Sequence, residues 1–181
     1  MAGKRILGAL VAAALTTAAA AGGQTTVTLP DTSLTTEVYT KVAETADVTV
    51  PAGVIFPVLN VAAGTTAGAA SMTVSNILLE TATKQLKISI QAGAASFTPP
   101  VSGATTWSAS DVTWNAATWT NATGVGGILS SSAFTEVATC NANVASCGTT
   151  GLVFTLAPKS TVKRAGDHIL SITWKFESIG L

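Results

Sequence analysis

Residues 168–177, HILSITWKFE, alternate large or apolar side chains with mostly polar ones over the whole segment. Because successive side chains of a β-strand point to opposite faces, this period of two predicts a strand with one apolar face. Burial of each large apolar side chain contributes about 1.5–3 kcal/mol, so we expect this closing strand to anchor the fold. Its apolar face carries His168, Leu170, Ile172, Trp174 and Phe176.

A second segment, residues 85–91, alternates in the same way, with Leu86, Ile88 and Ile90 between polar neighbours. Weaker strand signals recur along the chain, and no window of useful length has the spacing of an amphipathic helix. These weaker candidates are residues 25–29, 36–42, 47–50, 54–61, 72–79, 110–114, 133–140 and 151–156.

The segments between these candidates are rich in turn-forming residues. We expect residues 62–70 and 124–127 to be loops, and Pro99-Pro100 to break the chain near its middle. Residues 36–42 are expected to pair with residues 47–50. In the 54–61 candidate, Pro57 favours an edge or a bend. The pattern predicts an all-β protein: a single antiparallel β-sandwich, immunoglobulin-like or jelly-roll, of about eight or nine strands.

The beginning of the chain has the composition of an export signal. Lys4 and Arg5 supply positive charge, residues 6–15 are almost entirely apolar, and small side chains follow over residues 16–23. A membrane-spanning helix needs about 20 apolar residues, roughly twice the length of this run. We therefore expect residues 1–21 to be a cleaved signal peptide and residues 22–181 to form the sandwich domain. The mature protein is expected to be extracellular or at the cell surface, with the periplasm as the other option.

Composition excludes some classes of function and favours others. Charged residues make up 10% of the chain, and without Lys4 and Arg5 the balance is seven Lys+Arg against nine Asp+Glu, a net charge of −2. This balance lacks the basic patch of a nucleic-acid-binding protein, so no nucleic-acid partner is expected. A surface with so few charges has little electrostatic protection against self-association.

The two cysteines, Cys140 and Cys147, are close in sequence. In an exported protein an even number of nearby cysteines predicts a disulfide. Six residues separate them, whereas a redox dithiol usually has two. One histidine and two cysteines cannot fill the four ligand positions of a zinc site, and the acidic residues lack calcium-loop spacing. We expect a structural disulfide, no metal and no cofactor.

The candidate catalytic residues are few. His168 is the only histidine and follows Asp167, but neighbours on a strand point to opposite faces, so Asp167 is poorly placed to orient the imidazole. The carboxylates are scattered, without a close pair for acid–base chemistry. We therefore expect no enzymatic activity, and a secreted hydrolase is the least favoured alternative.

Three tryptophans, Trp107, Trp114 and Trp119, fall within thirteen residues. Val112 and Trp114 share a strand face, so Trp114 is expected in the core. Trp107 and Trp119 have two interpretations. Exposed in a row they would form a flat platform for sugar rings, whereas in the core their N–H groups would find backbone partners.

The segment Ala165-Gly-Asp-His-Ile-Leu-Ser-Ile-Thr-Trp-Lys-Phe176, together with the low-charge body, resembles exported bacterial pilin or spore-coat-type β-sandwich subunits. The resemblance implies a structural role in an assembly. Two features depart from chaperone-assisted fimbrial subunits: the cysteines are late in the chain, and residues 22–29 are short for an N-terminal donor segment.

The leading hypothesis is a non-enzymatic structural subunit that self-associates into a filament, coat or adhesive layer by sheet edges or strand addition. The candidate adding strand contains Thr25, Val27 and Leu29, and its acceptor would lie beside the closing strand. Other copies of the chain are the expected partners, and a periplasmic chaperone and glycans remain open. The alternative function is a secreted carbohydrate-binding module that uses Trp107 and Trp119.

Overall fold

The computed structural model describes residues 38–180, and this part of the chain is all-β. Its strands form three antiparallel sheets, and the one short helical element is a 3-10 turn, Ala109–Asp111 (η1). The predicted antiparallel β-sandwich is therefore confirmed. The strand from residues 25–29, with Thr25, Val27 and Leu29, lies outside the described residues, as does the signal segment 1–21.

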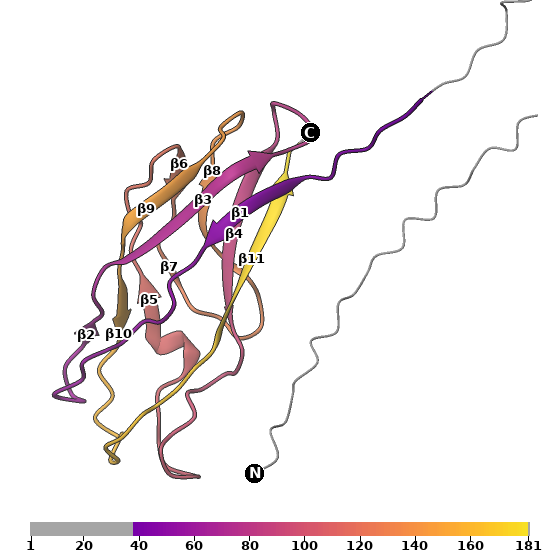
Figure 1. Cartoon of the computed structure of the whole chain (residues 1–181). Helices are drawn as coiled ribbons and strands as arrows, with labels where there is room; N and C mark the ends of the chain where they lie inside the picture. Colours follow the sequence, from indigo (N-terminus) through magenta and orange to yellow (C-terminus); the bar gives the residue numbers. More distant parts are fainter. Residues whose placement is uncertain (1–37, 181) are drawn as a thin grey trace, which may run out of the picture. The chain divides into compact units, whose positions relative to one another are not determined.

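The three sheets are arranged in two layers. The first sheet has the order β1 (Thr45–Thr49), β3 (Ala70–Leu78), β9 (Cys147–Leu152). The second has the order β2 (Thr65–Thr66), β10 (Phe154–Leu156), β5 (Val112–Trp114), β7 (Gly127–Ile128). The third has the order β11 (Ile172–Ile179), β4 (Gln85–Ala92), β8 (Thr135–Cys140), β6 (Ala122–Gly124). Only Val153 separates β9 from β10, so the second sheet continues the first, and Figure 1 shows β1, β3 and β9 in front of β4, β8 and β11.

The core lies between the layers and is built around β4. Ile88 and Ile90 are fully buried, because β4 has β11 on one side and β8 on the other. The closing strand was expected to anchor the fold; it pairs with β4 along its whole length and its apolar side chains pack against the core from one side. Its alternation is as predicted, but β11 is the edge strand of its sheet and its apolar face is only half-buried. Residues 168–171 precede the strand and make one isolated bridge, between Ile169 and Thr98.

The weaker strand predictions had mixed outcomes. Segments 47–50, 72–79, 110–114, 133–140 and 151–156 overlap β1, β3, β5, β8 and β9–β10. The described residues of 36–42 form no strand, and β1 pairs with β3 instead of with them. Residues 54–61 form no strand either: Pro57 supplies no backbone N–H for a ladder, and no partner strand lies beside the segment among the described residues. The loop expected at 62–70 contains β2 and the start of β3.

The loop expected at 124–127 instead contains the end of β6 and the start of β7. At Gly124 and Gly127 other atoms already occupy the space of a Cβ. A Cβ on Gly124 would lie 2.3 Å from the backbone oxygen of Ala117 and 2.6 Å from Cδ1 of Trp119, and one on Gly127 would collide with the ring of Trp114. These glycines therefore mark close packing between strand and indole, not turns.

Cys140 at the end of β8 and Cys147 at the start of β9 form a disulfide, as predicted. The bond links the third sheet to the first. In residues 38–180, no helix has the length and apolar character needed to cross a membrane.

Candidate functional site

The two lateral sides of the sandwich differ. On one side, Thr120 and Gly148 exchange backbone hydrogen bonds of 2.8 and 3.2 Å, and the disulfide joins the layers nearby. The other side is bordered by β1 and β11, each with a hydrogen-bonded neighbouring strand on one side only among the described residues. The second side is therefore open, and the candidate site lies there.

A groove runs along the open side between residues 51–61 and residues 162–174. It consists of two adjoining hollows of about 710 and 480 Å³ that share Phe56, Phe97 and His168. Its floor is formed by side chains that belong to the core and are otherwise buried. These are Trp107, Val112, Leu129, Phe154 and Leu156. The groove therefore opens onto the apolar interior.

One wall of the groove is the segment after β1. Val54, Phe56 and Val58 are half-buried, whereas Ile55, Pro57 and Leu59, each directly after one of them, are exposed. Side chains alternate as in a strand, but the backbone hydrogen bonds of residues 51–60 are local ones, from Val58 N to Phe56 O at 2.9 Å and from Ala63 N to Asn60 O at 3.0 Å. This wall therefore has an extended shape without the ladder of a strand.

The opposite wall is the free edge of β11. Gly93 N donates to Ser171 O at 2.9 Å, and the register pairs Ile172 with Ala92 and Trp174 with Ile90. Because hydrogen-bonded and non-bonded pairs alternate in an antiparallel ladder, the N–H and C=O groups of Ile172 and Trp174 point away from β4. The half-buried side chains of these two residues line the groove. Unpaired backbone groups and an apolar hollow therefore lie next to each other.

Further along the open side, the chain before β1 meets the end of β11. Glu44 Oε1 accepts hydrogen bonds from Glu80 N at 2.8 Å, Lys84 Nζ at 3.0 Å and Ser178 Oγ at 3.2 Å. The Glu80 N–H and then the Lys84 ammonium hold the pKa of the Glu44 carboxyl below its ordinary value. Hydrogen bonds to Glu80 and Glu44 raise the pKa of Lys84. This cluster joins the two edges at this point.

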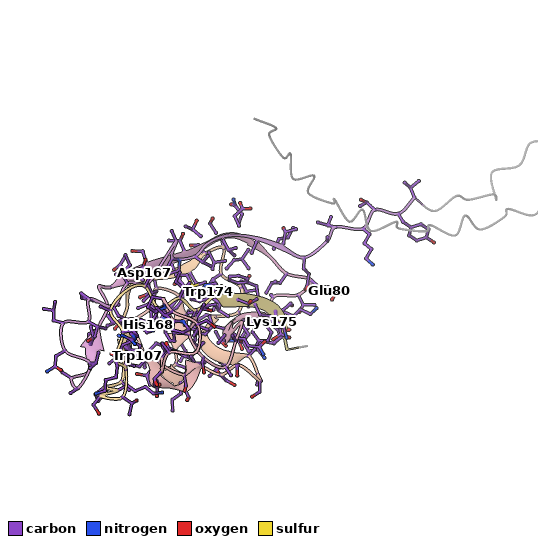
Figure 2. The ribbon with its side chains drawn as sticks, turned by 90° about the horizontal axis from the view of Figure 1, so that it is seen from below. Glu80, Trp107, Asp167, His168, Trp174 and Lys175 are labelled. Atoms are coloured by element: carbon purple, nitrogen blue, oxygen red, sulfur yellow. A yellow bond between two sulfur atoms is a disulfide. The ribbon has the colours of Figure 1, made fainter. Side chains whose placement is uncertain are left out.

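His168 lies at the junction of the two hollows and has a structural environment. Its Nε2 lies 3.1 Å from Arg164 O and its Nδ1 lies 2.7 Å from Thr106 Oγ1. A carbonyl can only accept, so Nε2 carries a proton and donates to Arg164 O, and in the neutral ring Nδ1 then accepts from the hydroxyl. The imidazole packs edge-on against Trp107, with ring centroids 5.2 Å apart (Figure 2). Neither ring nitrogen bonds to Asp167, so the two do not form part of a catalytic triad.

The tryptophans expected as alternative glycan contacts are in the core. Trp107 is 4% exposed and Trp119 is 8% exposed, so of the two interpretations left open by the sequence the structure has the core one, not the exposed platform. Trp107 Nε1 donates a hydrogen bond to Ala157 O at 3.0 Å, as expected for a tryptophan in the core whose N–H finds a backbone partner. A stacking surface for sugar rings requires accessible indole faces, and these two indoles do not provide them.

The site has few groups for other chemistry. Within residues 38–180, no group of three or more His, Cys, Asp or Glu side chains is placed to hold a metal ion. No protein-family model, curated protein or solved structure matches the chain. An acceptor beside the closing strand was expected from the sequence, but the groove and its 51–61 wall were not. The alternation of Val54, Phe56 and Val58 was the one available signal.

Proposed function

We propose that this protein is a non-enzymatic structural subunit, secreted or displayed at the cell surface, that self-associates into a filament, coat or adhesive assembly. The observation that carries the proposal is the groove between the free edge of β11 and residues 51–61, which opens onto the core. A monomer gains stability when such an apolar opening is covered.

Strand addition is the mode of association that this geometry favours. The outward N–H and C=O groups of Ile172 and Trp174 can pair with an incoming backbone. An extended segment places every second side chain on one face, and those side chains would enter the apolar hollows. Main-chain pairing would supply affinity, and the fit of the side chains would supply specificity.

The proposed incoming strand is residues 25–29 of another copy. Val27 and Leu29 are spaced two apart, as a strand that fills two adjoining hollows requires, and Pro30 follows directly. Burial of both side chains would contribute about 1.5–3 kcal/mol each before the cost of ordering the segment. Export through the 1–21 signal and, where needed, a periplasmic chaperone complete the proposal. It includes no cofactor.

Deletion of residues 24–29 tests the proposal. We expect a folded monomer by circular dichroism and a loss of large particles by light scattering. Two double variants of the same length, V27S/L29S and T26S/T28S, separate side-chain fit from chain length. Only V27S/L29S replaces the apolar side chains. Particle size unchanged by both the deletion and V27S/L29S would refute strand addition by this segment.

A further inference from the structure

Three loops meet at one end of the sandwich, the lower end in Figure 1. They are residues 50–64, 93–108 and 157–171. Thr98 and Ile169 exchange backbone hydrogen bonds of 2.8 and 3.0 Å, which join the second loop to the third. Lys159 N donates to Val61 O at 2.5 Å, which joins the third loop to the first. The three loops therefore form one continuous surface, the loop end.

The loop end exposes four large apolar side chains. Leu59 is 100% exposed, Ile55 82%, Ile169 63% and Val101 56%. They come from all three loops, and a fully exposed leucine packs against no neighbour. A fluid partner, which needs no matching shape, suits such a surface.

The charges near these side chains are mainly positive. Lys163 and Arg164 line the same groove rim as Ile55 and Leu59, and neither forms an ion pair with the described residues. The remaining cation of the loop, Lys159, is bound to Asp111 at 2.8 Å and is neutralised there. Asp167 is the one other carboxylate in residues 157–171, which leaves the surface with an excess of positive charge.

We propose that the loop end docks on an anionic lipid bilayer. Apolar side chains at loop tips enter the region below the headgroups, and flanking Lys and Arg side chains bind the anionic headgroups at the surface. Leu59, Ile55, Ile169 and Val101 are the inserting side chains, and Lys163 and Arg164 are the headgroup contacts.

The loop end adjoins the groove. Ile55, Leu59 and Ile169 line the larger hollow together with Val54, Phe56 and Val58, but the first three side chains are mostly exposed. Vesicle binding reports membrane docking and particle size without lipid reports assembly, so the two properties can be tested independently.

The test is co-sedimentation of the secreted protein with vesicles. We expect binding to mixed phosphatidylglycerol and phosphatidylcholine vesicles and much weaker binding to pure phosphatidylcholine. The variant I55S/L59S should bind the anionic vesicles roughly tenfold or more weakly, since each buried side chain contributes more than one tenfold step. The variant K163Q/R164Q should lose the preference for anionic lipid, and added salt should reduce the binding of the wild type.

Ile128→Ser is the matched control, because Ile128 is 57% exposed on β7, outside the three loops. It should bind as the wild type does. Equal wild-type binding to both vesicle types, or wild-type affinity in I55S/L59S, would overturn the proposal. So would a change of particle size without lipid in I55S/L59S, since that would make the loop end a contact between copies. Mass spectrometry of each variant should show the same N-terminus, so that differences in vesicle binding reflect the substitutions alone.

Discussion

The carboxylate of Glu44 accepts a hydrogen bond from the hydroxyl of Ser178 at 3.2 Å, although 134 positions separate the two residues in sequence. The contact joins the chain entering the first strand of one layer to the last strand of the other. The same carboxylate oxygen accepts from Glu80 N and Lys84 Nζ. The open side of the sandwich is therefore closed at this end by one carboxylate.

This cluster predicts a loss of stability in acid. The folded-state pKa of Glu44 lies below its ordinary value of 4.5, and Lys175, followed by Lys87, lowers the pKa of Glu177 in the same way. A lowered pKa contributes stability that is fully present above the ordinary value and is lost as the pH falls through the folded-state value. We expect the melting temperature to fall between about pH 5 and about pH 3.

Glu44→Gln should reduce this acid dependence, because the amide keeps an acceptor for Glu80 N–H but carries no charge for Lys84. The comparison is thermal unfolding followed by circular dichroism at both pH values. Asp167→Asn is the control, since Asp167 forms no ion pair in the part of the chain described. An acid response in Glu44→Gln identical to that of the wild type would contradict the assignment.

Gly127→Ala should destabilise the fold by about 1–3 kcal/mol, because the added Cβ collides with the Trp114 ring and the strand must shift. Urea unfolding measures the change. Gly53→Ala is the matched control, because a Cβ there has no heavy atom within 4 Å. Equal effects of the two substitutions would show that the indole does not require glycine at position 127.

Removal of the disulfide by C140A/C147A should lower the free energy of unfolding by about 2–3 kcal/mol, the value expected for a short closed loop. Both positions are buried, so alanine avoids placing a hydroxyl in the core. A reducing agent should shift the urea midpoint of the wild type and leave that of the variant unchanged. A reduced wild type as stable as the oxidised one would refute the stabilising role.

The sequence predicted the elements whose environment is regular. Strand β4 is buried on one face by its neighbours, so the alternation of Leu86, Ile88 and Ile90 was sufficient. The strands that contain Gly124 and Gly127 were missed because these glycines make room for Ala117 O and Trp119 in one case and for Trp114 in the other, and such tertiary contacts leave no local signal.

Residues 54–61 show the opposite error. Their side chains alternate as a strand requires, but the backbone has no partner strand to pair with. The groove exists for the same reason, since it depends on which edges the topology leaves unpaired. Local pattern predicted that β11 has an apolar face, and only the fold shows that this face borders an opening.

Strand addition between copies can be tested most directly by disulfide trapping. A copy carrying Leu29→Cys is mixed with a copy carrying Ala52→Cys, a groove-lining position, and the mixture is oxidised with the Cys140–Cys147 bond intact. The account predicts a dimer linked between positions 29 and 52, identified by mass spectrometry, and a much lower yield with Thr28→Cys. A yield of the 29–52 dimer no higher than that obtained with Thr28→Cys would contradict it. So would a 29–52 disulfide that forms only when both new cysteines are placed in the same chain.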